Sequence, residues 1–425
     1  MTEGGHAVVP GGFHGQVAVV AGPRLLSGVT DGPGLAIHRR RWPLPPPISA
    51  DDLVALTGRV DVRGRGGAAF PFSRKLATAV DAGNKRFVVV NASEGEPGSA
   101  KDSGLLLTVP HLVLDGAELV AEALQVDMIH IVVPGERTEV RPAVEAAIAE
   151  RQDDGGTISY VVHQTNGGFV GGQARAVIEL MSGRENLPVT SWAPEAISGF
   201  KNKPTLLSNA ETYAQVAALV GLGPSEYARV GTAEEPGTTL LTVAGDGPGA
   251  VVLEVPFGVK LADVLDHCGH SVDAPVLMGG YHGAWLSSTD VIQRRVTRAD
   301  LTAAGATLGA GVVLPVDREA CPIDLTARIV AYLAGQSARR CGPCRNGLPA
   351  LAEALDALAV GGGGTPVLER VRQMTGLLPG RGSCAHPDGT VRLVNSMLRM
   401  FPDEVNAHAY DACPRVNDPR KAVAR

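Results

Sequence analysis

The chain has 425 residues, a formal net charge of −6 and a hydrophobic content of 44%. That content excludes a disordered chain, and the length exceeds what a single core usually supports, so we expect a globular protein of several domains. The negative charge offers no broad attraction to polyanions, so we expect no nucleic-acid partner. Since the sequence contains neither a long apolar run nor a signal-peptide pattern, we expect a cytoplasmic protein without direct membrane insertion.

The chain divides by pattern into five parts. Residues 1–50 are rich in Gly and Pro and end in a proline-rich run, which predicts an extended N-terminal lead-in. Residues 51–235 alternate continuous apolar runs with helical patterns, which predicts an α/β domain with buried, largely parallel strands. Residues 236–320 predict a small mixed α+β domain, residues 321–415 a bundle of four amphipathic helices, and residues 416–425 a tail.

Four loops of the α/β part carry the chemical signal. The first is the glycine-rich segment Gly64–Lys75, the second is Asn91–Gly98 directly after a strand, the third is Gly167–Gly172 and the fourth is Lys203–Thr212. Glycine lets backbone N–H groups approach a phosphate closely, and a following helix start adds a positive dipole end. Ligands of open α/β sheets bind beyond the carboxyl ends of the strands. One such loop is more often a simple turn, but four together indicate a binding site.

Through these four loops and their order, the sequence resembles a known family over roughly residues 45–413. The family is the NADH-binding flavoprotein subunit of respiratory complex I, with its relatives in NAD-linked hydrogenases and formate dehydrogenases. The resemblance implies a Rossmann-like FMN domain, a small ubiquitin-like β-grasp (SLBB) domain and a C-terminal helical bundle that carries a [4Fe–4S] cluster. It also implies that NADH gives a hydride to FMN and that electrons leave singly through the cluster.

The resemblance assigns both a flavin site and two catalytic carboxylates. The catalytic residues that it implies are Glu94 and Glu96. The cofactor-binding residues that it implies are Gly64, Arg65, Gly66, Gly67, Phe70, Lys75, Asn91, Ser93, Glu94, Gly172, Gln173, Ser208, Asn209 and Thr212.

The nicotinamide side of the site departs from the family pattern. Gln173 and Ala174 stand where the family has two adjacent glutamates, and Ser93 stands where it has an aspartate. Fixed negative charge disfavours the anionic reduced flavin, so the loss of these carboxylates is expected to change the flavin potential and the nicotinamide contacts. NAD(H) therefore remains a possible substrate, with a reduced ferredoxin as the other candidate donor.

The cluster site departs from the family pattern as well. The three matching thiols are Cys341, Cys344 and Cys384. Ala338 stands at the fourth position, and a methyl group cannot ligate iron. The alternatives are a [4Fe–4S] cluster with a non-cysteine ligand, for which Ser337 and His386 are nearest in sequence, a [3Fe–4S] cluster, a vacant site, or zinc held by the three thiols and His386.

The other three cysteines receive no chemical role from the sequence. Cys268 and Cys321 are expected to be small buried apolar residues, and Cys413 belongs to a terminal segment that resembles the end of the family's chain.

Two functions follow from these observations. The first is an NADH dehydrogenase-like flavoprotein oxidoreductase that passes electrons between a nicotinamide or ferredoxin donor, FMN and an iron–sulfur site. Its expected protein partner is a thioredoxin-like [2Fe–2S] protein or a ferredoxin. The alternative is a non-catalytic structural or assembly paralogue, which the departures at Ala338, Gln173 and Ser93 motivate and the retained glycines and Lys75 oppose.

Overall fold

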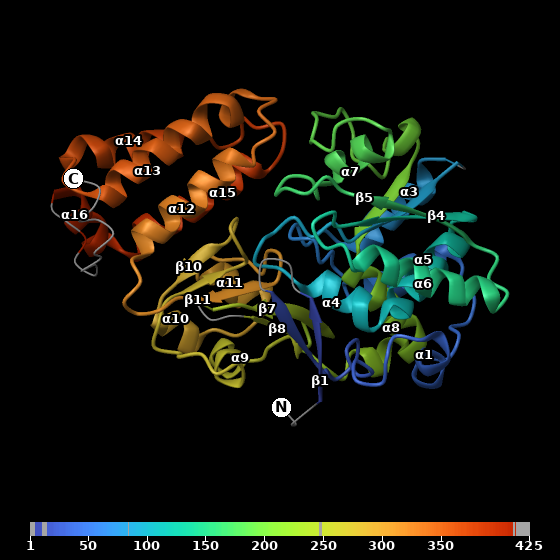
Figure 1. The fold of residues 1–425 in the computed structure, drawn as a ribbon. Coiled ribbons are helices and arrows are strands. Elements are labelled where there is room, and N and C mark those ends of the chain that lie inside the picture. The colour runs from blue at the N-terminus through green and yellow to red at the C-terminus, as the bar shows by residue number, and fades with distance from the viewer. Residues whose placement is uncertain (1–4, 11–14, 84, 246–248, 411–412, 414–425) are drawn as a thin grey trace.

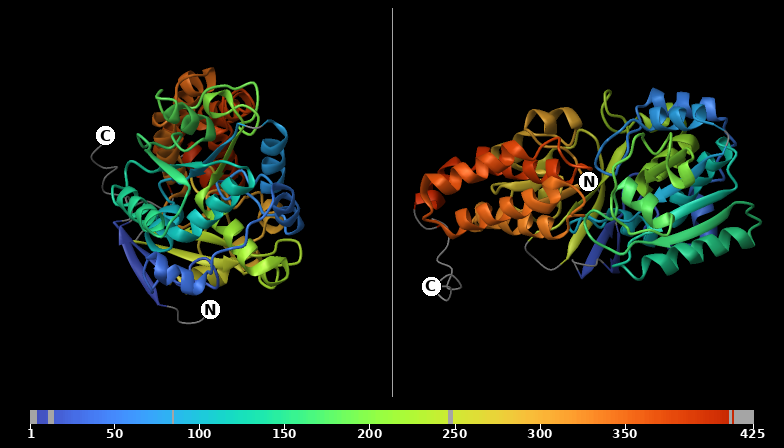
Figure 2. Two further views of the ribbon diagram at one scale, coloured as in Figure 1. Left: turned by 90° about the vertical axis from the view of Figure 1, so that its right-hand side faces the viewer. Right: turned by 90° about the horizontal axis from the view of Figure 1, so that it is seen from above.

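A computed structural model describes residues 5–10, 15–83, 85–245, 249–410 and Cys413. Figure 1 shows three bodies: an α/β domain, a second sheet beside it, and a helical bundle that extends away from both. Figure 2 shows from above that the bundle and the α/β domain lie at opposite ends of the molecule. The expected tail, residues 416–425, lies outside the described residues.

The elements occur in the following order. The first half contains β1 (His6–Pro10), β2 (Gln16–Val20), α1 (Leu35–Arg41), α2 (Ala50–Arg59), α3 (Phe72–Asp81), β3 (Phe87–Asn91), α4 (Lys101–Thr108), α5 (Pro110–Ala123), β4 (Met128–Val133), α6 (Val140–Asp153), β5 (Ser159–Gln164), α7 (Ala174–Met181), η2 (Phe200–Asn202), β6 (Thr205–Asn209) and α8 (Ala210–Tyr227). The second half contains β7 (Thr238–Val243), β8 (Ala250–Pro256), α9 (Leu261–His267), β9 (Val276–Met278), β10 (Ala284–Leu286), α10 (Ser288–Gln293), α11 (Arg298–Ala303), β11 (Val312–Pro315), α12 (Pro322–Gly335), η3 (Pro343–Gly347), α13 (Leu348–Val360), α14 (Gly364–Leu377), α15 (His386–Met400) and α16 (Pro402–Tyr410).

The sheet of the α/β domain is parallel throughout. Its order is β5-β4-β3-β6, so the first strand of the domain lies between the second and the fourth. This is the strand order of a Rossmann half, in which the direction of chain progression reverses between β3 and β6. Both faces are covered: Val88 and Val90 join the main core, whereas Val89 packs with α7. The predicted Rossmann-like architecture is confirmed, and the reversal point lies at the carboxyl ends of β3 and β6.

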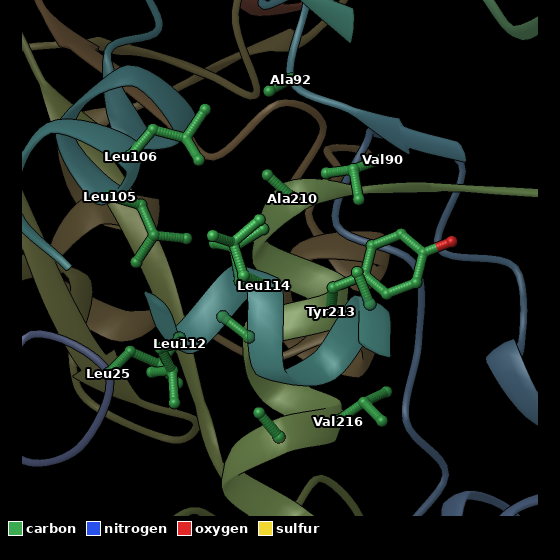
Figure 3. Packing of buried hydrophobic residues seen from close by; sticks show 14 of the residues in the cluster. Leu25, Val90, Ala92, Leu105, Leu106, Leu112, Leu114, Ala210, Tyr213 and Val216 are labelled. Atoms are coloured by element: carbon green, nitrogen blue, oxygen red, sulfur yellow. The ribbon is translucent and has the colours of Figure 1, made fainter. Parts of the chain in front are cut away.

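Helix α8 is held against α5 by close packing. Ala210, Tyr213 and Val216 recur every three residues on α8 and lie in the same cluster as Leu114 of α5 (Figure 3). The Tyr213 hydroxyl lies 3.0 Å from the carbonyl oxygen of Leu206, so this buried aromatic residue keeps a hydrogen bond. The packing fixes the position of the α8 N-terminus, which begins directly after β6.

Gly116 of α5 is where the two helices approach most closely in this contact. A Cβ atom at residue 116 would lie 1.9 Å from the carbonyl oxygen of Tyr213. We expect Gly116→Ala to lower the free energy of unfolding by about 1–3 kcal/mol, because the overpacked helices must separate. Thermal denaturation would test this, with Gly376→Ala in α14 as a control, since nothing lies within 4 Å of its Cβ position. Equal stability of the two variants would contradict the prediction.

The second sheet corrects the expectation for the N-terminus. It has seven strands in the order β1-β2-β8-β7-β11-β9-β10. β1 and β2 form an antiparallel hairpin, and β2 pairs in parallel with β8. Residues 6–10 and 16–20 are therefore strands of this sheet and not an extended lead-in. The alternating burial of Val17 and Val19 gives the reason, because every second side chain of β2 enters the core.

The bundle has one helix more than expected in the described chain. α12, α13, α14 and α15 match the four predicted amphipathic helices, and α16 follows α15 after Phe401. Pro402 interrupts the helical hydrogen bonds and starts this new helix, since proline is well tolerated in a first turn.

Within the described ranges, no single helix meets the length and hydropathy needed to cross a bilayer. α4 and α5 meet that test only together, as a pair bent by 96°.

Candidate functional site

Three of the four predicted loops meet at the carboxyl ends of β3 and β6. The last residues of these strands, Asn91 and Asn209, are paired in register, and the Asn209 amide lies 3.3 Å from the carbonyl oxygen of Asn91. Asn209 is also the N-cap of α8, where its side chain accepts a hydrogen bond from the Glu211 N–H. From the first loop, the N–H of Arg65 donates to the hydroxyl of Thr212 at 3.0 Å. The positive end of α8 therefore opens at this point and favours an anion.

The second and third loops interlock beside it. The Asn91 amide donates to the carbonyl oxygen of Gly172 at 2.8 Å, and the hydroxyl of Ser93 donates to the other side of the same Asn91 amide at 2.6 Å. A Cβ atom at residue 172 would lie 2.6 Å from the Ser93 hydroxyl oxygen, and one at Gly95 would lie 2.8 Å from the carbonyl oxygen of Phe169. Glycine is thus required at both positions by the close approach of the loops.

The first loop contributes two cations with different surroundings. The ammonium group of Lys75 donates to the carbonyl oxygen of Leu207 at 2.9 Å, and burial lowers the pKa of Lys75, an effect that Glu195 opposes. The guanidinium group of Arg65 is directed toward the second sheet instead, where it donates to the carbonyl oxygen of Thr238. Other predicted residues of the site are Gly66 beside Asn209, Ser208 buried in β6 and Phe70, which is half-exposed.

A buried network of charged side chains forms hydrogen bonds with Asn209. The sequence did not lead us to predict this network. The ammonium group of Lys101 lies 2.8 Å from Asp102, 3.1 Å from Glu211 and 3.1 Å from the Asn209 side-chain oxygen. Burial lowers the pKa of Lys101, but Asp102 and Glu211 outweigh it and raise the pKa above its ordinary value. The sequence carried a signal for this role, because Lys101 is one of only seven lysines and precedes the apolar run Leu105–Leu107.

A cavity of about 210 Å³ lies between the first loop and the second sheet. Its lining includes Gly64, Arg65, Gly67, Lys101, Glu211, Arg298 and Leu308. Three of these residues are cations and one is an anion, so the cavity favours a negatively charged group. Within the described chain, the buried Nε of Arg65 has no hydrogen-bond partner, although it lies 3.4 Å from Glu211. The glycine cradle, the cations and this unpartnered donor fit a phosphate-bearing cofactor such as FMN.

The two predicted catalytic carboxylates have opposite environments. Both oxygens of Glu94 are occupied: they accept from the Ser99 hydroxyl, from the N–H groups of Asp102 and Ser103, and from Arg137 at 2.8 Å. Burial acts to raise the pKa of Glu94, but Arg137 and the serine hydroxyls outweigh it and hold the pKa below its usual value. Glu94 is therefore a fixed anion that orders its loop, and the expected catalytic role does not fit this geometry.

Glu96, two residues later, is the carboxyl group that can exchange a proton near neutral pH. Burial raises its pKa to about 7, against the opposing hydrogen bonds from the N–H groups of Tyr281 and Gly98. Its oxygen lies 3.0 Å from the Tyr281 nitrogen in the turn between β9 and β10. Glu96 thus joins the second loop to the second sheet and carries a titratable group at their contact.

This pKa makes stability depend on pH with a defined sign. The native carboxyl holds its proton up to about pH 7, whereas the unfolded one releases it near the ordinary value of 4.5, so native protein binds more protons in between. Stability therefore falls as pH rises across that window, by about 3 kcal/mol in total. We expect Glu96→Gln to remove this fall. Unfolding midpoints of both proteins at about pH 5 and about pH 8 test it, and an unchanged pH dependence in the variant would contradict it.

The three predicted cluster thiols gather where the bundle meets the third loop. The Cys341 thiol has hydrogen bonds with Cys344 and with Ser383, which precedes Cys384. Burial raises the pKa of Cys384, whereas a hydrogen bond donated by the Gln173 side chain lowers it. Gln173 is the N-cap of α7 and follows the flavin-side Gly172 directly, so a single residue links the second and third loops to the thiols.

The fourth position of this thiol site remains without a histidine ligand. His386 is fully buried, and both of its ring nitrogens are engaged, Nε2 at 2.8 Å from the carbonyl oxygen of Leu333 and Nδ1 at 3.1 Å from His282. The Ser337 hydroxyl donates to the carbonyl oxygen of Cys344. Among the described residues, the three thiols are not brought within the 4.8 Å that would suit one ion. This spacing argues against the zinc alternative.

Two known protein families match separate parts of the chain. The family described as Nuo51 FMN-binding domain matches residues 58–218, and the NADH-ubiquinone oxidoreductase-F iron–sulfur binding region matches residues 324–408. The F subunit of NADH-quinone oxidoreductase from Salmonella typhimurium is 30% identical over 85% of this chain and 85% of its own length. The F 2 subunit of the same enzyme from Rhizobium meliloti is 28% identical over 86% of this chain and 90% of its own length.

Solved structures show the same likeness. The air-oxidized NAD⁺-reducing [NiFe]-hydrogenase contains a chain with a TM-score of 0.82 and 26% identity, which covers 93% of this chain and 68% of that one. These likenesses favour an oxidoreductase over the non-catalytic alternative. With the FMN-type loops at the β3/β6 switch point and the thiols of the bundle in contact with them, the chain belongs to the family of the NADH-quinone oxidoreductase F subunit, whose members are FMN- and iron–sulfur-containing electron-transfer oxidoreductases.

Proposed function

We propose that this chain takes electrons from a reduced nicotinamide at the β3/β6 switch point and passes them to the thiol-bound iron–sulfur centre of its bundle. The observation that carries the proposal is the contact between the third loop and Cys384, because Gly172 touches the flavin-side loop while Gln173 donates a hydrogen bond to the thiol. The two sites are thereby joined by adjacent residues of one rigid segment.

The residues of the switch point would hold FMN in the following way. The glycines of the first loop let backbone N–H groups approach the cofactor, and Lys75 with the α8 N-terminus supplies positive charge for its phosphate. Asn91 and Asn209 fix the loops around it through their amide groups. Bound FMN would supply the conversion of a two-electron donor into one-electron steps. Buried Glu96 could release or accept a proton near neutral pH at the same contact.

The partner is proposed from the relatives. Their names describe subunits of NADH-quinone oxidoreductase, and the solved neighbour is a hydrogenase chain, so all of them work within larger electron-transfer assemblies. We infer that this chain passes its electrons to a small iron–sulfur protein, a thioredoxin-like [2Fe–2S] protein or a ferredoxin.

Rapid mixing tests the donor. The purified chain, loaded anaerobically with FMN, iron and sulfide, should lose its flavin absorbance on mixing with NADH or NADPH. If the protein binds FMN but loses its flavin absorbance only with reduced ferredoxin, then the electron donor is ferredoxin and not a nicotinamide. Failure to bind FMN at all would contradict the switch-point site itself.

The link at Gln173 makes a separate prediction. A hydrogen bond to a thiolate stabilises the more negative, reduced centre, so Gln173→Leu should lower the reduction potential of the iron–sulfur centre. A hydrogen bond to a charged group is worth about 1.5–3 kcal/mol, which corresponds to roughly 60–130 mV for one electron. A redox titration followed by electron paramagnetic resonance measures the shift, with the FMN content as the control. An unchanged potential would show that the contact does not influence the centre.

A further inference from the structure

A second group of ligand-type side chains lies at the far end of the bundle, away from the site described above. Cys321 is the N-cap of α12, His408 lies in the last turn of α16 and Cys413 follows that helix. Their ligand atoms all lie within 4.8 Å of one another, and they form the only such group among the described residues. All three are buried, with exposed fractions of 6%, 0% and 9%. The sequence had assigned them no chemical role.

The orientation of His408 is that of a metal ligand. Its Nδ1 lies 3.1 Å from the carbonyl oxygen of Ala359 and 3.2 Å from that of Leu358, at the end of α13. A carbonyl oxygen can only accept, so Nδ1 carries the proton and Nε2 carries the lone pair of the ring. Nε2 in turn faces the sulfur of Cys321 at 3.2 Å. Metal-binding histidines almost always donate their second ring N–H to a carbonyl or carboxylate in this manner.

The group is separate from the iron–sulfur thiols. Cys321 precedes the first residue of α12, whereas Cys341 follows beyond its last one, and the 14 residues of this helix span about 21 Å. Figure 1 shows α16 at the end of the bundle that lies away from α7 and the α/β domain. The two groups of cysteines are therefore too far apart to bind the same metal ion.

We propose that Cys321, His408 and Cys413 bind one Zn²⁺ ion, which fastens Cys413 and α16 to the start of α12 and the end of α13. Two thiolates and one imidazole form the borderline-soft ligand set that zinc prefers, and a water molecule can complete the tetrahedron. The site is already ordered by the His408 contacts, so binding requires only the loss of two thiol protons and a small movement of the sulfur atoms. The proposal is independent of the proposed electron-transfer function.

Metal analysis of the full-length chain, purified under reducing conditions, tests the site. We expect about one zinc per chain, retained when Cys341, Cys344 and Cys384 are all replaced by serine. His408→Gln and Cys413→Ser should each lose most of the zinc but keep the FMN and iron content. Cys268→Ser, which changes a partly buried cysteine at the end of α9, is the matched control and should retain the zinc.

A second measurement does not depend on the variants. Co²⁺ added to zinc-free wild-type protein should give the thiolate charge-transfer and tetrahedral absorption bands of a two-sulfur site, and Cys413→Ser should weaken them. Zinc that remains in both His408→Gln and Cys413→Ser would overturn the proposal. So would wild-type protein that holds no zinc and takes up no Co²⁺, or whose Cys321 and Cys413 prove to be joined as a disulfide that binds no metal after reduction.

Discussion

Lys101→Met is expected to destabilise the protein by about 3–5 kcal/mol, the cost of leaving a buried charge without its partner. Lys101 is 2% exposed, and its ammonium group contacts Asp102, Glu211 and Asn209 at 2.8–3.1 Å. Methionine keeps the volume of the side chain but removes the cation beside Asp102 and leaves Glu211 with Arg65, 3.4 Å away, as its cation. Because Asn209 loses one of its partners as well, the variant should also bind FMN more weakly.

Chemical and thermal denaturation would measure the loss of stability, and fluorescence titration would measure FMN affinity. Lys85→Met is the matched control, because Lys85 is exposed and its replacement should change neither quantity. The double variant Lys101→Met/Glu211→Gln should recover part of the lost stability, since it removes one of the two carboxylates that lose the lysine. A single variant as stable as the wild type would show that the network does not hold a charged lysine.

Gly172→Ala is expected to weaken FMN binding by about 5- to 150-fold. The added methyl carbon would lie 2.6 Å from the Ser93 hydroxyl oxygen, so the second and third loops must move apart. Such overpacking typically costs about 1–3 kcal/mol, and every 1.4 kcal/mol is a factor of ten in affinity. The same movement would pull Gln173 away from Cys384, so the iron–sulfur centre should change its potential too.

Equilibrium dialysis or fluorescence titration with FMN checks this, and Ser93→Gly in the Gly172→Ala background provides the decisive comparison. Removal of the hydroxyl frees the space that the methyl group needs, so affinity should return toward the wild-type value. An unrescued loss would mean that Gly172 acts through another contact, and an unchanged single variant would mean that the loops are not closely packed around the cofactor.

The third loop, Gly167–Gly172, contacts all three bodies of the molecule. It touches the second loop through Gly172 and the bundle through Phe169, whose N–H donates to Gln336 at 3.1 Å. The ring of Phe169 also packs edge-on against His282 of the second sheet, with centroids 4.5 Å apart. All three bodies therefore meet at one short segment, so that a change there is felt at both cofactor sites.

The main architecture could be predicted from the sequence alone. The continuous β-branched runs of β3 and β4 require burial on both faces, which only a parallel sheet between helices provides. The glycine loops and the thiols of the bundle could also be placed, because turn chemistry and ligand type are properties of local sequence. The hairpin β1–β2 was missed because its partner, β8, lies more than 200 residues further along the chain.

Charge states and ligand groupings were decided only by the tertiary structure. Glu94 and Glu96 stand in the same short loop, yet the pKa of Glu94 lies below its usual value and that of Glu96 is raised to about 7. Arg137 and the serine hydroxyls outweigh burial at Glu94, whereas burial outweighs the two backbone hydrogen bonds at Glu96. Cys321 and His408 are 87 residues apart and become neighbours only when α16 packs against α13 and α14, beside the start of α12. Sequence periodicity reports which residues are buried, whereas ionisation and metal binding depend on what each buried group faces, and distant segments supply those partners.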